Sequence, residues 1–211
     1  MKQLKHIVQS EVEKVDQVIR SVDLADPAVY ALWAAQTYYY VCHSTRLLAL
    51  SASRFPQSKD AFHKRFCHHI SEESGHEHLA RRDVKAVGFD VADLPELPAT
   101  KAFYQTQYYQ IEHIDAMAFW GYILCLETLA VHSGDWMLEI ARKTHGSDAV
   151  NFLKLHNSED VDHLEKAYRT LEDLDNNVFE LIQDNLMLSS SLYSDMVRQC
   201  AAFAEAKTAA A

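Results

Sequence analysis

Two imidazoles and a carboxylate recur at helical spacing near residue 160. The segment LHNSEDVDHLEK, residues 155–166, carries His156, Asp160 and His163 at positions i, i+4 and i+7. In an α-helix these three side chains share one face, together with the apolar Leu153. A polar group that faces inward needs a hydrogen-bonding partner, a counter-charge or a metal ion. This segment alone leaves two interpretations open: a set of metal ligands, or the edge of a solvated, charged helix face.

Two other segments place carboxylates and an imidazole at positions suited to the same chemistry. In FCHHISEESGHEHL, residues 66–79, Glu73 and His76 are spaced i, i+3, which predicts one helix face. Helical bundles that hold two irons or two manganese ions use this device. Glu127 lies in GYILCLETLAV, where its neighbours are almost all apolar. Burying that carboxylate without a partner would cost several kcal/mol, so we interpret Glu127 as a metal ligand.

Several nearby residues have a simpler interpretation. We expect His68, His69 and His78 to lie at the surface or around the ligands rather than to bind metal. Glu72 competes with Glu73 for the inner face of the helix, and we favour Glu73 because of its spacing from His76.

The complete set contains three carboxylates and three imidazoles on three predicted helices. Mixed oxygen and nitrogen ligands suit two first-row divalent ions, whereas a closed structural zinc site would typically use thiolates. The four cysteines are widely spaced and form no CxxC pair, which is typical of small core residues in a reducing compartment. Arg46, in an otherwise apolar helix, is interpreted either as an anchor for a substrate carboxylate or as the partner of an acid.

Composition limits the class of protein. The chain has 211 residues, of which 48% are hydrophobic, and its formal net charge is −10. This charge argues against binding to nucleic acid, and there is no basic cluster that would bind an anionic membrane. We find no secretory signal and no run of 18 apolar residues, so a cytoplasmic protein without a transmembrane helix is expected.

The fold is predicted to be an all-α bundle in one domain, residues 1–211. Glycine and proline together number only nine, which favours long helices over strands. Asp26-Pro27, Thr100, Ser147 and Asp175 provide capping signals, and Gly88 and Gly146 provide stops. Seven helices are expected, at about residues 2–22, 26–54, 58–88, 100–117, 118–145, 147–174 and 175–206. The remaining tail, about 206–211, is expected to be flexible.

At the ligand positions the sequence resembles the haem-oxygenase-like diiron oxidases and oxygenases, within the TenA/PqqC-like fold superfamily. The resemblance covers about residues 25–200 and implies a seven-helix, haem-oxygenase-like bundle. The family pattern is a Glu and a His on one helix, a Glu on a later helix, and then His-x-x-x-Asp-x-x-His. The matching positions are Glu73 and His76, Glu127, and His156, Asp160 and His163.

The resemblance implies O2 activation at two non-haem irons, with manganese as an alternative metal. On this hypothesis one iron is held by Glu73, His76, Glu127 and His156. The other is held by Asp160 and His163, with Glu73 and Glu127 as bridges. The substrate is expected to be a small molecule such as an amino acid, a fatty acid or a related metabolite. An external electron donor and a homodimer are left open.

Two other classes of function are retained. One is a metal-independent TenA/PqqC-like enzyme, a hydrolase or a quinone-cofactor oxidase, for which Cys125 is the candidate nucleophile. The other is a non-catalytic bundle that binds a metal or a ligand.

Overall fold

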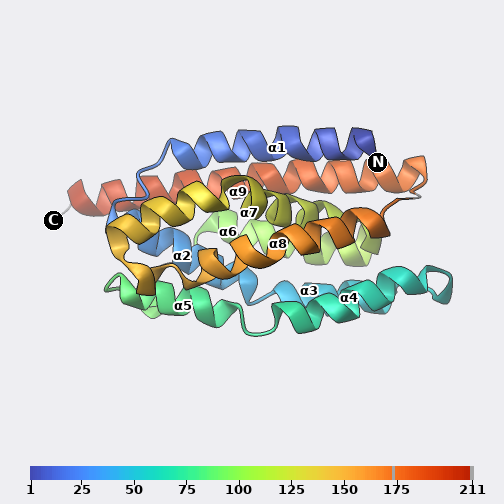
Figure 1. Ribbon diagram of the computed structural model, residues 1–211, viewed down its shortest axis with the longest axis horizontal. Coiled ribbons are helices and arrows are strands. Elements are labelled where there is room, and N and C mark those ends of the chain that lie inside the picture. Colours follow the sequence, from blue (N-terminus) through green and yellow to red (C-terminus); the bar gives the residue numbers. More distant parts are fainter. Residues whose placement is uncertain (173, 210–211) are drawn as a thin grey trace.

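The chain folds into a helical bundle, shown in Figure 1 as a computed structural model. The structure describes residues 1–172 and 174–209, except for the side chains of residues 159–162 and 208. Within this part all regular structure is helical, which confirms the all-α prediction. The α-helices are α1 (Lys2–Arg20), α2 (Pro27–Val41), α3 (Ser44–Arg54), α4 (Asp60–Glu73), α5 (Glu77–Ala86), α6 (Pro98–Tyr109), α7 (Phe119–His145), α8 (Asn151–Thr170) and α9 (Asn176–Ala209). Short 3-10 helices (Gln57–Lys59, Val91–Asp93, Ala116–Ala118 and Ser147–Ala149) and a π-helical turn (Gln110–Ile114) occupy several connections.

The prediction of seven helices was wrong because two of the expected helices are each divided. The helix expected over residues 26–54 stops at Val41 and restarts at Ser44. The helix expected over residues 58–88 stops at Glu73, and Gly75 follows with φ of +94°. Only glycine adopts such a left-handed conformation readily, and this conformation does not continue an α-helix.

Most helix ends follow the predicted signals. The Asp26 carboxylate accepts a hydrogen bond from the Ala28 amide at 2.7 Å, and Asp175 accepts one from the Val178 amide at 2.9 Å. Ser147 is an exception, since it begins a 3-10 turn and α8 starts only at Asn151. Thr100 is another, since α6 begins before it and its hydroxyl is buried. That hydroxyl donates a hydrogen bond to Gln36 of α2 at 2.8 Å, so Thr100 joins two helices instead of capping one. The last helix, α9, extends to Ala209, beyond its expected end.

The helices form two outer groups around a central apolar helix. Figure 1 shows α1 and α9 side by side along one edge, α3, α4 and α5 along the opposite edge, and α8 running between them. The central helix is α7, which packs against α1, α8 and α9. Two glycines allow this close packing: a Cβ atom at Gly121 would overlap the backbone of α9, and one at Gly134 would overlap the Asn157 side chain of α8.

The segment Ala116–His145, which contains α7, is apolar and long enough to span a membrane. However, 78% of its most apolar window is buried inside the fold. Such burial is typical of the core helix of a bundle.

Candidate metal centre

Helix α4 brings two potential ligands to the inside of the bundle. His69 and Glu73 are spaced i, i+4, so they lie one turn apart on the same helix face. His69 is 4% exposed, and its Nε2 atom lies 3.4 Å from Oε1 of Glu73. The inward face of α4 therefore carries an imidazole and a carboxylate in direct contact.

The first cluster consists of Glu73, His76 and His156. Oε2 of Glu73 lies 3.3 Å from Nδ1 of His76, and the rings of His76 and His156 are 5.1 Å apart. One potential ligand atom from each of the three residues lies within 4.8 Å of the other two. Nδ1 of His156 donates a hydrogen bond to the Phe152 carbonyl at 3.0 Å, which leaves Nε2 as its metal-binding atom.

The second cluster consists of His69, Glu127 and His163, which are all buried. Oε1 of Glu127 lies 3.5 Å from Nε2 of His69, and the rings of His69 and His163 are 5.4 Å apart. The three potential ligand atoms again lie within 4.8 Å of one another. Each cluster thus offers two imidazoles and one carboxylate, a donor set that fits a first-row divalent ion.

His69 connects the two clusters. Its Nε2 atom faces the carboxylates of both Glu73 and Glu127, at 3.4 Å and 3.5 Å. The two clusters therefore lie next to each other, and each supplies two imidazoles and one carboxylate. These donor atoms fit a pair of neighbouring metal ions.

Five of the six predicted ligands lie together in these clusters: Glu73, His76, Glu127, His156 and His163. The side chain of Asp160, the sixth, lies outside the described residues.

The structure also differs from the predicted arrangement in three ways. Glu73 and His76 do not share one helix, because the chain breaks at Gly75 between them. Glu127 groups with His69 and His163 instead of with Glu73. His69 was expected outside the ligand set, but it is buried within the second cluster. Its spacing of i, i+4 from Glu73 was the signal that could have identified it.

Glu72 and Glu73 are adjacent on α4 but have different charged partners. Glu72 pairs with Arg65 at 2.8 Å and with Lys166 at 3.0 Å. Although burial raises the pKa of Glu72, these cations and His163 lower it to about 2. Burial also raises the pKa of Glu73, but hydrogen bonds from His69 and His76 hold it well below its usual range. Glu72 thus pairs with an arginine and a lysine in addition to imidazoles, whereas Glu73 pairs with the imidazoles of His69 and His76.

Asp83 of α5 fixes the start of α8, which carries His156 and His163. Its two carboxylate oxygens accept hydrogen bonds from the backbone amides of Asn151 and Phe152, at 2.9 Å and 2.8 Å. A carboxylate at this position satisfies the otherwise unpaired amides of the first helical turn. Because His156 lies one turn further along α8, this contact helps to set its position relative to His76.

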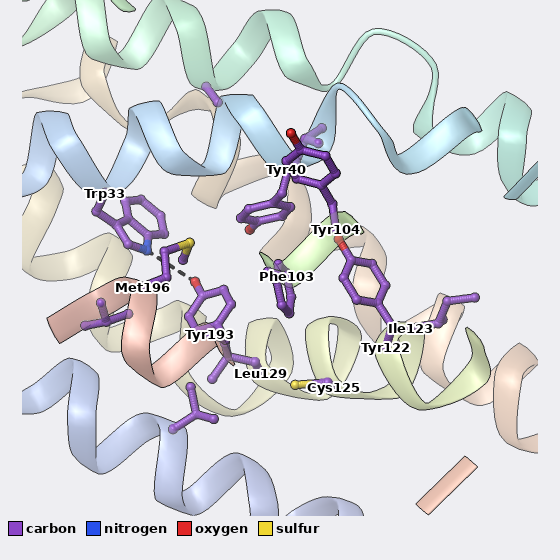
Figure 2. Packing of buried hydrophobic residues seen from close by; sticks show 14 of the residues in the cluster. Trp33, Tyr40, Phe103, Tyr104, Tyr122, Ile123, Cys125, Leu129, Tyr193 and Met196 are labelled. Carbon is purple, nitrogen blue, oxygen red and sulfur yellow. Dashed lines mark hydrogen bonds between the residues drawn. The ribbon is translucent and has the colours of Figure 1, made fainter. Parts of the chain in front are cut away.

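A cavity of about 100 Å³ adjoins both clusters, and His69, Glu73, Glu127 and His156 are among the residues that line it. Figure 2 shows part of the aromatic wall, including the hydrogen bond of 3.2 Å from Nε1 of Trp33 to the Tyr193 hydroxyl. The aromatic lining residues are Trp33, Tyr40, Phe119, Tyr122, Phe152 and Tyr193. Arg46 is exposed and donates a hydrogen bond to the Cys42 carbonyl, so it does not reach this cavity as a substrate anchor.

Comparison with protein families adds to this geometry. Residues 31–186 match the model of a family described as iron-containing redox enzymes. The chain belongs to this family. No protein of curated function matches the sequence.

Several solved structures share the fold of this chain. A domain of unknown function from Shewanella denitrificans, with a heme oxygenase-like fold, has a TM-score of 0.82 and 20% identity, covering 100% of this chain and 94% of its own. A TenA homologue from Pseudomonas syringae has a TM-score of 0.74 and 11% identity. The match covers 93% of this chain and 92% of the homologue. A CADD-like protein of unknown function from Nostoc punctiforme has a TM-score of 0.70 and 12% identity. The match covers 95% of this chain and 100% of that protein. The chain therefore has a haem-oxygenase-like fold.

Proposed function

We propose that this protein is a non-haem diiron oxidase or oxygenase that uses O2 to oxidise or cleave a small organic substrate. The observation that carries the proposal is the pair of neighbouring clusters, each with two imidazoles and one carboxylate, at the wall of one apolar cavity. Membership of a family of iron-containing redox enzymes supports the choice of iron, although the same donors also suit manganese.

The ligand roles follow from the two clusters. Glu73, His76 and His156 would hold one ion, and His69, Glu127 and His163 the other. Asp160, on the same helix as His156 and His163, remains a proposed ligand of the second ion.

Bound ferrous ions would supply the site for O2 and the electrons that reduce it. Glu73 and Glu127 both approach His69, so the residues that would hold the two ions are neighbours. The apolar cavity would orient the substrate and exclude water. An external donor would return the site to its reduced state.

The metal-independent alternative has weaker support at its candidate nucleophile. Cys125 is fully buried, and it is not among the described residues that line the cavity. Burial, with a smaller contribution from the charge of Glu11, raises the pKa of the Cys125 thiol to about 12. Because the thiolate is the reactive form, this thiol is poorly suited to nucleophilic attack at neutral pH.

Anaerobic loading with Fe(II), followed by iron counting and measurement of O2 uptake, tests the proposal. The wild-type chain should bind two irons and consume O2. His163→Ala should lose about half of the iron and stop O2 uptake, because the chemistry needs both ions. His113→Ala is the matched control, since His113 is exposed and outside both clusters.

Three results would decide against the proposal. If the wild type bound no iron, the metal-independent alternative would be favoured. If it bound two irons but did not react with O2, a storage or binding role would be favoured. If His163→Ala kept two irons and normal O2 uptake, the second cluster would have been assigned wrongly.

A further inference from the structure

The lining of the cavity is mostly apolar, and its two carboxylates and two imidazoles belong to the proposed metal centre. Ser44 and Asn157 add neutral polar groups, and the remaining wall is mainly aromatic and aliphatic. No lysine or arginine is among the residues described as lining it. A ligand ammonium or carboxylate in the apolar part would be desolvated without a counter-charge, at a cost of several kcal/mol.

Tyr122 provides a polar atom within the aromatic part of the wall. Its side chain is 3% exposed, and its hydroxyl makes no hydrogen bond to any described residue. The ring is held firmly, since it packs 4.7 Å from Phe103 and 5.3 Å from Phe119. Figure 2 shows it extending from α7 into the aromatic cluster beside Phe103. By contrast, the hydroxyl of Tyr193, another lining residue, already accepts a hydrogen bond from Trp33.

An unsatisfied buried hydroxyl lowers stability, whereas a ligand group that pairs with it gains affinity. Such a hydroxyl both donates and accepts, so an alcohol, aldehyde or amide oxygen suits it. The aromatic walls suit an aliphatic or aromatic body.

We propose that the cavity binds a molecule with an apolar body and a single uncharged polar end, and that the Tyr122 hydroxyl hydrogen-bonds to that end. In the metal-free cavity free amino acids are disfavoured, because their ammonium and carboxylate groups find no matching pair of charges in the lining. That this molecule is the substrate rests on the proposed function, but its binding does not.

A series of eight-carbon ligands tests the selectivity by calorimetry: octane, 1-octanol, octanoate, octylamine and 2-aminooctanoate. The full-length protein is used both without metal and after anaerobic loading with Fe(II). We expect 1-octanol to bind at least about tenfold more tightly than each of the three charged ligands, which corresponds to about 1.4 kcal/mol. Equal or tighter binding of octanoate or 2-aminooctanoate would overturn the proposal.

Variants then test the location and the role of Tyr122. Tyr122→Phe should weaken binding of 1-octanol about fivefold and leave binding of octane unchanged, since it removes only the hydroxyl. An equal loss for both ligands would mean that Tyr122 acts by packing alone.

Ala130→Phe should block binding, because Ala130 lines the cavity, whereas Val131→Phe, at an exposed neighbouring position, should not. Leu126→Phe is a smaller change that fills the same cavity if Ala130→Phe does not fold. Undiminished binding in the folded cavity variants would overturn the location.

The outcome is independent of the test for iron. If 1-octanol binds to a protein that takes up no iron, the ligand class stands and the diiron function fails. If the iron-loaded protein consumes O2 but does not bind 1-octanol, only the ligand class fails.

Discussion

Two carboxylates in this protein, Asp16 and Glu73, have opposite surroundings. Asp16 of α1 accepts hydrogen bonds from Ser133 at 2.6 Å and from Trp136 at 2.8 Å, and it pairs with Arg20 at 2.6 Å. Glu73 of α4 instead faces the imidazoles of His69 and His76, and a second carboxylate, Glu127, approaches the same ring of His69. Asp16 is buried and Glu73 is half-buried, and Asp16 accepts hydrogen bonds from a hydroxyl, an indole and a guanidinium group.

The difference separates a structural carboxylate from a candidate ligand. Asp16 joins α1 to α7, and its donors satisfy its charge without any ion. Glu73 lies among groups that are themselves good metal ligands. A buried carboxylate therefore indicates a metal site when its neighbours are imidazoles and other carboxylates, and a structural contact when its neighbours are hydroxyl, indole and guanidinium groups.

Replacing each carboxylate by alanine should give the largest and the most clearly opposed effects. Glu73→Ala should lose about half of the bound iron or more and abolish O2 uptake, while changing the unfolding free energy of the metal-free protein only slightly. Asp16→Ala should keep its iron but lose about 3 kcal/mol of stability, because buried donors are left unpaired. Iron counting and urea unfolding measure the two quantities. If Asp16→Ala lost iron as well, the distinction between the two sites would fail.

The helix break at Gly75 offers a smaller, matched test. Gly75→Ala and Gly88→Ala should each cost about 1–2 kcal/mol, because φ is +94° and +92° and a Cβ atom would meet nothing at either position. Gly75, unlike Gly88, lies between Glu73 and His76. Of the two variants, Gly75→Ala alone should therefore also weaken binding of one of the two irons. Metal titration of both variants distinguishes the effect of backbone strain from the loss of a metal site. Equal iron affinity in the two variants would show that the turn does not position the ligands.

The smallest effect is expected from acid. Burial raises the pKa of Asp16, but hydrogen bonds from Ser133, Arg20 and Trp136 outweigh it and lower the pKa from its ordinary value of 3.8. The stabilisation from Asp16 is therefore present above that value and lost as pH falls through the lower, folded-state pKa. Unfolding of metal-free wild type and Asp16→Asn, compared between neutral pH and about pH 3, should show a shallower loss in the variant. Parallel curves would contradict this contribution.

Much of the architecture was predictable because helix ends carry local chemical signals. Asp26 and Asp175 cap helices through their own side chains, and Gly88 and Gly146 end helices with left-handed φ values. The break at Gly75 was not predicted, because a glycine within a helical pattern does not reveal whether the chain continues or turns there.

The ligand set was predicted in part for a similar reason. Spacing along one helix identified His156 and His163, and an apolar context identified Glu127. The pairing of Glu127 with His69 depends on how α4 and α7 pack, and this is a contact between distant segments that local spacing does not encode. The sequence does not distinguish the buried His69 from the nearby histidines His68 and His78, which are exposed.

The close packing of Gly134 against Asn157 has a consequence for sequence divergence. Glu127 lies on α7 and His156 lies on α8, so the contact that sets the spacing of these helices also sets the spacing of the ligands they carry. A side chain at position 134 would overlap the Asn157 amide. Asn157 would then have to turn away and lose its hydrogen bond to Asp135, or be replaced by a smaller residue. The two positions are therefore expected to change together among relatives, as a correlated pair that contains no metal ligand yet maintains the geometry of the centre.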